Sequence, residues 1–197
     1  MGKNMTAEKE AYRILVASAS DKMVSVVRDV LPGPQYRDIS YVSTMGDAKR
    51  MLVSHICDIL IINTPLKDDF GIQSAIDIAE QHETGILLLV KAEMYEQVSS
   101  QVEDYGIVTL ARPTTRQSLY ASVKMLSAVQ MKIKKLEKDM RRLKERMQEQ
   151  QTIDRAKWIL VDQRKMSEPD AHRYIEKSAM DRCVRKIRIA EEILRDS

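Results

Sequence analysis

The stretch from Leu119 to Gln150 constrains the fold more than any other, because it contains neither proline nor glycine and repeats its apolar residues in heptads. If Leu119 is assigned to position a, most a and d positions are apolar over more than four heptads. Such a repeat predicts the seam of a coiled coil. The predicted seam consists of Leu119, Leu126, Val129, Ile133, Leu136, Met140, Leu143 and Met147.

Charged residues beside this repeat favour a parallel homodimer. Lys132 at position g would face Glu137 at position e of the partner helix, and Asp139 would face Lys144 in the same way. Both pairs are attractive, although exposed ion pairs contribute little to stability. The alternative is a single long helix packed on its own domain. We prefer the dimer, because an isolated helix would leave the apolar stripe in water.

Residues 12–117 contain five short apolar runs separated by segments with helical spacing. The runs are 13–18, 39–42, 58–63, 85–90 and 107–111. Apolar strands that alternate with amphipathic helices predict a parallel sheet covered on both faces. Five such units in about 105 residues predict an α/β flavodoxin-like, CheY-like domain. We therefore divide the chain into an N-terminal tail (1–11), this domain (12–117), a coiled-coil linker helix (118–151) and a C-terminal domain (152–197).

The C-terminal domain is predicted to contain three short helices. The first covers about 153–165, the second starts after a cap at Ser167, and the third covers about 183–195. The Ser-Glu-Pro-Asp sequence at 167–170 is typical of a helix N-terminus. The expected buried faces are Ile153, Ala156, Ile159 and Leu160; then Ala171, Tyr174, Ile175, Ser178 and Ala179; and then Val184, Ile187, Ala190 and Leu194.

The net charge of +3 is unevenly distributed along the chain. Residues 12–116 carry ten Lys and Arg against fourteen Asp and Glu, whereas 117–151 carry nine against four and 152–197 eleven against nine. A basic part joined to an acidic one indicates a polyanion binder with a separate control domain; a solvated helix surface explains the charge equally well. Cys57 and Cys183 lie far apart, which indicates reduced thiols in a cytoplasmic protein. No segment resembles a membrane span or a secretion signal.

Residues 152–197 resemble an ANTAR domain, the RNA-binding module of bacterial antitermination regulators. The resemblance rests on Ala156-Lys157, Met-Ser-Glu at 166–168, Ala171 followed by Tyr174, Ala179-Met180-Asp181 and Ala190. Trp158 departs from the pattern, because many members have a small residue there. We expect Trp158 and Tyr174 to be core residues; the alternative for Trp158 is a stacking surface for a base.

The resemblance implies that the protein binds paired stem-loops in a leader transcript, prevents a terminator hairpin from forming and so lets transcription continue. A dimer would present two modules, which raises the effective concentration of the second. Cations would contact phosphates and base edges, and flat groups would stack on loop bases. The candidate RNA-binding residues are Lys157, His172, Arg173, Lys177, Arg182, Arg185 and Lys186.

The N-terminal domain resembles a two-component receiver, but its motif positions differ. Ser18 and Ala19 stand where a receiver has two acidic residues that hold Mg²⁺, and Asn63 stands at the phosphoacceptor position. The hydroxyl and Lys positions at the ends of the fourth and fifth strands are Lys91 and Arg112.

Without these acids we expect a pseudo-receiver that has no metal or cofactor. Its input would be dimerisation or contact with a ligand-sensing protein, as in the amidase-operon type of regulator. Asp68 and Asp69 lie too far into the following loop to substitute for the missing phosphoacceptor.

Three other classes of function compete with RNA binding: an enzyme, a DNA-binding response regulator, and a coiled-coil scaffold whose basic face is incidental. The sequence has no phosphate-binding loop, no metal motif and no nucleophile elbow, and His55, His82 and His172 are isolated, so we do not expect an enzyme. A DNA-binding response regulator with a trihelical output domain is the stronger alternative. Such a domain usually has a glycine in the turn before its recognition helix, and the turns here have none.

Overall fold

The computed structural model describes residues 11–31, 33–36 and 38–196. The predicted N-terminal tail at 1–11 therefore lies almost entirely outside the described residues. The chain divides into two compact units, Met1–Ile133 and Lys134–Ser197. We refer to them as the N-terminal unit and the C-terminal unit and describe each by itself.

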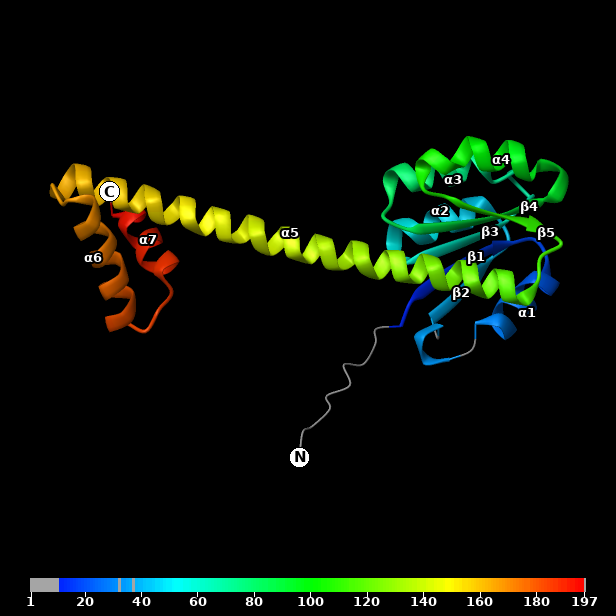
Figure 1. The fold of residues 1–197 in the computed structure, drawn as a ribbon, viewed down its shortest axis with the longest axis horizontal. Helices are drawn as coiled ribbons and strands as arrows, with labels where there is room; N and C mark the ends of the chain where they lie inside the picture. Colours follow the sequence, from blue (N-terminus) through cyan, green and yellow to red (C-terminus); the bar gives the residue numbers. More distant parts are fainter. Residues whose placement is uncertain (1–10, 32, 37, 197) are drawn as a thin grey trace, which may run out of the picture. The chain divides into compact units, whose positions relative to one another are not determined.

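Five parallel strands form the sheet of the N-terminal unit (Figure 1). They are β1 (Arg13–Ser18), β2 (Asp38–Val42), β3 (Ile59–Asn63), β4 (Gly85–Lys91) and β5 (Val108–Arg112). Their order in the sheet is β2-β1-β3-β4-β5. This is the flavodoxin-like order, so the predicted α/β CheY-like fold is confirmed.

Helices cover both faces of this sheet, because each parallel connection must cross over it. α2 (Met45–Ser54), α3 (Ile72–Gln81) and α4 (Tyr95–Val102) pack on one face, while α1 (Asp21–Val30) and the first turns of α5 pack on the other (Figure 1). Short 3-10 turns occur at Pro34–Tyr36, Ala92–Met94 and Glu103–Tyr105. Ser20 and Thr44 cap α1 and α2 by accepting hydrogen bonds from backbone N–H groups.

Alternate residues of each strand serve opposite faces of the sheet. Leu15 and Ala17 belong to the core under α2–α4, whereas Ile14 and Val16 belong to the core under α1 and α5. The central strands β3 and β4 are buried almost throughout. Both faces of a central parallel strand are covered, which is why these runs are continuously apolar rather than alternating.

The helix α5 extends without interruption over the 49 residues Arg116–Arg164. The separate helix predicted at 153–165 is therefore wrong: those residues continue α5. No proline or glycine occurs near Thr152 to end the helix. The domain boundaries expected after residues 117 and 151 both fall inside α5. Despite its length, α5 is too charged to span a bilayer, and no other helix in the described residues is long and apolar enough to do so.

The C-terminal unit is completed by α6 (Glu168–Asp181) and α7 (Lys186–Arg195). Ser167 caps α6 as predicted, because its side chain accepts a hydrogen bond from the Asp170 backbone N–H. The unit has a small core, made of Ala156, Leu160, Ala171, Ile175, Ala179, Ile189 and Ala190. Alanines at these positions allow the helices to approach closely.

The third helix starts later than its sequence pattern predicted. It begins at Lys186, so Val184 lies before it and is 38% exposed, whereas Ile189 is buried although it was not expected to be. The chain reaches Lys186 through a Schellman motif at the end of α6: Cys183 N–H donates to Met180 O, and Val184 N–H donates to Ala179 O. The residue after the cap, Cys183, has φ of 51°.

Candidate nucleic-acid interface

The carboxyl edge of the sheet contains the residues that correspond to receiver motif positions. Asn63 ends β3, is 4% exposed and pairs in register with Ser18 of β1. Its Nδ2 donates to Ser18 Oγ at 3.0 Å, and its Oδ1 has no hydrogen-bond partner among the described residues. An amide and a hydroxyl therefore occupy this edge, at positions where a receiver has carboxylates.

Arg112 is tied to the same edge. It ends β5, and its Nη2 donates to the Thr64 carbonyl, while its Nε is buried without a partner among the described residues. Burial lowers the pKa of Arg112 below its ordinary value. Thr64 in turn donates its hydroxyl to the Leu89 carbonyl at 2.9 Å. Lys91, at the end of β4, is exposed.

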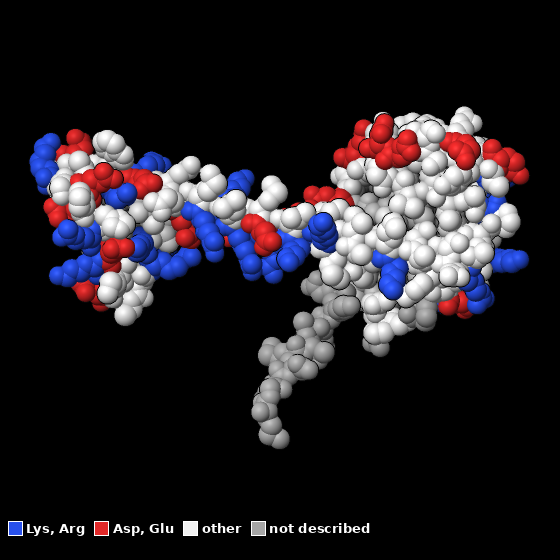
Figure 2. Space-filling view, in the orientation of Figure 1, with Lys and Arg blue, Asp and Glu red and all other residues white. Residues whose placement is uncertain are grey.

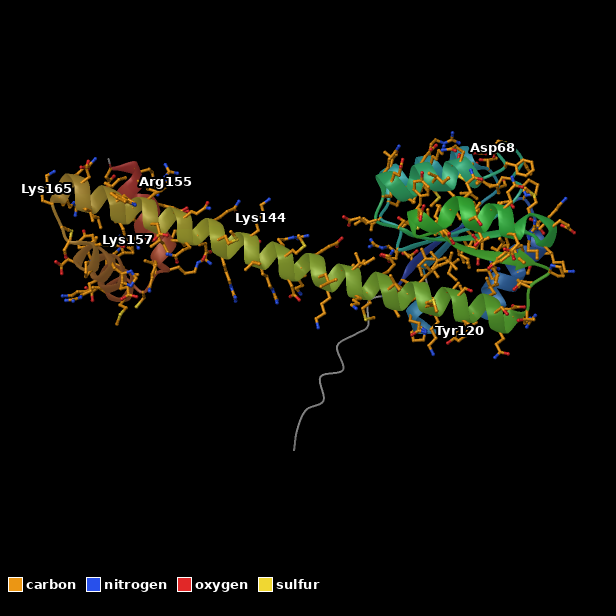
Figure 3. All side chains as sticks on the ribbon, turned by 45° about the horizontal axis from the view of Figure 1, so that its top comes forward. Asp68, Tyr120, Lys144, Arg155, Lys157 and Lys165 are labelled. Carbon is orange, nitrogen blue, oxygen red and sulfur yellow. The ribbon has the colours of Figure 1, made fainter. Side chains whose placement is uncertain are left out.

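Asp68 and Asp69 both accept hydrogen bonds from residues at the start of a helix. Asp68 accepts hydrogen bonds from the N–H groups of Met45 (2.8 Å) and Gly46 (2.9 Å) at the start of α2 (Figure 3). These bonds hold the pKa of Asp68 below its ordinary value. Asp69 accepts from Gly71 N–H at 2.9 Å and from the Ser74 hydroxyl at the start of α3. Asp68 is thus engaged by the backbone of α2, which precedes it in the chain, and Asp69 by Gly71 and Ser74 at the start of α3, which follows it.

Two residues assigned to the coiled-coil seam are part of the receiver core instead. Leu119 is 0% exposed and Leu126 is 5% exposed, and they join Val123 against the sheet. Their assignment to the seam is wrong, because the first turns of α5 cover one face of the sheet. The remaining seam residues are exposed by 37–71%: Val129, Ile133, Leu136, Met140, Leu143 and Met147. Their pairing with a second helix stays a prediction.

Lys157 is the most enclosed of the predicted RNA-binding cations. Its side chain is only 17% exposed, and its Nζ lies 2.7 Å from Asp154 and 3.8 Å from Glu168 (Figure 3). The hydrogen bond to Asp154 raises the pKa of Lys157 and lowers the pKa of Asp154. Lys157 thus links α5 to the first turn of α6.

Three other candidates form ion pairs at the surface of the C-terminal unit. Arg182 pairs with Glu192, Arg185 with Glu149, and Lys186 with Glu176. The hydrogen bond from Lys186 lowers the pKa of Glu176, and that from Arg182 lowers the pKa of Glu192. Exposed pairs of this kind contribute little free energy, so a phosphate can replace the carboxylate.

The outer face of α6 carries the remaining candidates. Arg173 and Lys177 are exposed, lie one helical turn apart, and form no ion pair with another described residue. His172 lies 3.3 Å from Glu176. In Figure 2, basic side chains extend along α5 and over the C-terminal unit, where acidic ones are interspersed, while acidic side chains gather over α3 and α4. Arg173 and Lys177 are therefore the cations most available to a phosphate.

Two aromatic residues expected in the core lie at the surface. Trp158 is 72% exposed, and Tyr174 is 38% exposed. Trp158 is two residues from both Ala156 and Leu160, so it lies about 160° around the helix from the buried face. The Arg164 guanidinium stacks 5.5 Å from the centre of the Tyr174 ring, and its Nη1 donates to Tyr174 Oη at 3.2 Å. The helical period alone would have placed Trp158 correctly.

Comparison with known proteins finds a domain family that matches the C-terminal unit and a relative that spans most of the chain. Residues 141–194 match the model of the ANTAR domain. The transcriptional regulatory protein PdtaR of Mycobacterium tuberculosis, in strains H37Rv and CDC 1551, is 24% identical over 182 residues, which cover 92% of this chain and 89% of PdtaR.

Solved receiver domains share the fold of the N-terminal unit. The receiver domain of an HD domain-containing protein from Pseudomonas fluorescens Pf-5 has a TM-score of 0.59 and 18% identity over 67% of this chain and 98% of that domain. The receiver domain of a LuxO repressor protein from Vibrio parahaemolyticus has a TM-score of 0.57 and 19% identity over 64% of this chain and 96% of that domain. The chain thus combines a CheY-like receiver fold with a C-terminal ANTAR domain, as its resemblance to ANTAR-domain response regulators predicted.

Proposed function

We propose that this chain binds stem-loops in leader transcripts as a homodimer and thereby prevents termination of transcription in the cytoplasm. The ANTAR match over the helical C-terminal unit is the observation that carries the proposal. The name of PdtaR, a transcriptional regulatory protein, supports the same class of function. The proposed role is binding, and we propose no enzymatic step.

The surface of α6 suits a polyanion. Arg173 and Lys177 present two cations that form no ion pair with another described residue, and Tyr174 on the same helix adds a flat ring that stacks with Arg164 of α5. RNA loops expose phosphates and unstacked bases, which cations and flat side chains recognise respectively. We therefore assign phosphate binding first to Arg173 and Lys177, and then to the ion-paired Arg182, Arg185 and Lys186, with His172 beside them. Lys157, which lies between Asp154 and Glu168, we assign to contact with a base edge.

The exposed part of the heptad repeat supports dimerisation. Leu136, Met140, Leu143 and Met147 are each more than half exposed on one helix, in the pattern of a coiled-coil seam. A second copy would remove these side chains from water. The dimer would hold two ANTAR domains at a high effective concentration, so that one transcript with two loops binds more tightly than either loop alone.

The receiver fold would act without phosphorylation. Asn63 cannot accept a phosphoryl group, and the residues at its edge offer no carboxylate pair for Mg²⁺. We propose that contact with another protein, such as a ligand sensor, supplies the input. Incubation of the full chain with acetyl phosphate and Mg²⁺ should produce no phosphoryl mass shift, and a shift located in residues 12–117 would overturn this part of the proposal.

RNA binding is tested by measuring the affinity of the full chain for a library of RNA hairpins and for duplex DNA at several salt concentrations. Replacing Arg173 and Lys177 with Ala should weaken hairpin binding and reduce the slope of log affinity against log salt by about 1.5–2. The matched control replaces the exposed Lys67 and Lys91 of the N-terminal unit and should leave both unchanged. Tight binding to duplex DNA without hairpin binding would favour a DNA-binding regulator instead.

A further inference from the structure

The packing of the C-terminal unit does not explain why residue 158 is a tryptophan. It is 72% exposed, whereas the buried side of the same helix is filled by Ala156 and Leu160. A large apolar ring left in water contributes nothing to the core and costs solvation free energy. Tryptophan is also among the residue types that are enriched at binding interfaces.

A pocket of about 370 Å³ adjoins Trp158 within the C-terminal unit. Its lining consists of Asp154, Lys157, Trp158 and Val161 from α5 and Glu168 from the first turn of α6. Trp158 and Val161 supply apolar surface, while the other three residues supply charge. The volume is in the range that small ligands occupy.

The charges of the pocket select against phosphate. Asp154 and Glu168 outnumber Lys157, so the lining has a net charge of −1 when all three are ionised. Lys157 Nζ is already 2.7 Å from Asp154. Glu168 is 78% exposed and lies 3.8 Å from the same ammonium group, so its oxygens remain accessible as hydrogen-bond acceptors. A flat ligand that donates hydrogen bonds suits this pocket better than an anion does.

We propose that Trp158 and this pocket bind one unpaired RNA base that carries an exocyclic amino group. The inference rests on the proposed RNA-binding function. The base stacks on the indole ring, and its amino group donates to the carboxylate of Glu168. Arg173 and Lys177 hold phosphates elsewhere on the unit. The pocket therefore reads the identity of a base, whereas the cations supply affinity that does not depend on sequence.

Because the chain contains a single tryptophan, its fluorescence reports directly on this pocket. Hairpins with a common stem and randomised loops are first selected for binding to the full chain. The tightest hairpin should change the Trp158 emission on binding. Removing one loop base at a time to give abasic RNA should identify one position that restores the emission and weakens binding by roughly 5- to 150-fold, the range for base stacking on an aromatic ring.

The same position should lose most of its importance in the variant Trp158→Ala, in which the affinities of the abasic RNA and the intact hairpin should differ only by the contribution of the amino group. Trp158→Phe should keep most of the discrimination. The matched control Met180→Ala removes another exposed side chain, 77% exposed and outside the pocket lining, and should leave the abasic profile unchanged. Both tryptophan variants should fold normally, since the ring is mostly in solvent.

The role of the amino group is tested with a hairpin that carries, at the same position, a base analogue without that group. That analogue should bind about 5-fold or more weakly to the native chain, and this difference should shrink in Glu168→Gln. Equal binding of base and analogue would overturn the amino-group assignment. Unchanged emission together with identical abasic profiles in the native chain and Trp158→Ala would overturn the whole inference, while hairpin binding itself would still support the proposed function. Failure to select any hairpin would overturn the proposed function.

Discussion

Leu119 and Leu143 belong to one heptad repeat on one helix, but they have different surroundings. Leu119 is fully buried against the sheet of the N-terminal unit, whereas Leu143, in the C-terminal unit, is 59% exposed. The helix α5 is continuous through both positions. A heptad repeat therefore shows that one side of a helix is apolar, but it does not show which surface covers that side.

The two residues lie on either side of the point where the apolar face of α5 leaves the receiver core. Leu126 is the last residue of α5 in the receiver core, and from Val129 onward the exposed fraction of the predicted seam rises to 37% or more. The sheet covers the first part of the apolar face. The second part needs another partner, which we propose to be a second copy of the chain.

Leu119→Ala tests the buried part and should have the largest effect. Removing a fully buried leucine should lower the free energy of unfolding by about 2–5 kcal/mol, because it leaves a cavity between α5 and the sheet. Urea unfolding of the full chain would measure this. The control Met125→Ala removes a side chain that is 65% exposed on the same helix and should change stability by less than about 0.5 kcal/mol. A small loss of stability together with weaker self-association would instead indicate that Leu119 packs in the coiled-coil seam.

Leu143→Ala tests the exposed part. It should leave unfolding of the N-terminal unit unchanged and weaken self-association by roughly 1.5–3 kcal/mol per chain, the value of burying one leucine side chain. Sedimentation equilibrium over a range of concentrations would measure the dimer affinity. Lys138→Ala, outside the a and d positions, is the matched control. A native chain that remains monomeric at every concentration would refute the coiled-coil dimer.

Much of the N-terminal unit could be predicted from sequence, because its apolar strands and its amphipathic helices can both be recognised along the whole domain. Each strand is a short apolar run between amphipathic helices, and parallel connections of this length admit few topologies. The chemistry at the carboxyl edge was also readable, since Asn63 is the last residue of the apolar run that forms β3. The partners of Asp68 were not readable, because the loop brings it to the N-terminus of α2, which is distant in sequence.

The C-terminal unit was harder to predict, because its core is small. The sequence predicts its alanines to be buried, as they are, but it also predicts that the larger Tyr174 and Trp158 add to the core, and both lie at the surface. The helix α7 also begins later than the sequence predicts. The reason is that α6 ends in a Schellman motif at Cys183 and Val184, and the glycine that usually marks such a motif is missing there. Which cations form ion pairs depends on contacts between helices, and the sequence does not contain that information directly.

Asp68→Asn tests whether the aspartates beside the receiver edge are structural, and its effect should be smaller than that of either leucine. The pKa of Asp68 is lowered in the folded chain, so its carboxylate stabilises the fold above its unfolded pKa of about 3.9. Asp68→Asn should therefore unfold at lower urea concentration than the native chain above about pH 5. The difference should shrink as the pH falls through the folded pKa, below about 4. A difference that is independent of pH would show that the carboxylate charge has no such role.

Cys183→Gly extends the comparison of the two units to their backbones, and it should have the smallest effect. In the described part of the N-terminal unit, positive φ values occur at Gly33, Gly71 and Gly106, whereas in the C-terminal unit they occur at Lys165 and Cys183. A side chain at φ near 51° is strained, and glycine relieves that strain while increasing the entropy of the unfolded chain. We expect the relief of backbone strain to outweigh the entropy cost at this helix end. The free energy of unfolding of the C-terminal unit, measured by thermal unfolding, should therefore rise by about 0.5–1 kcal/mol. Cys183→Ala, which keeps the Cβ atom, is the control and should show no gain; equal gains in both variants would assign the effect to the thiol rather than to the backbone.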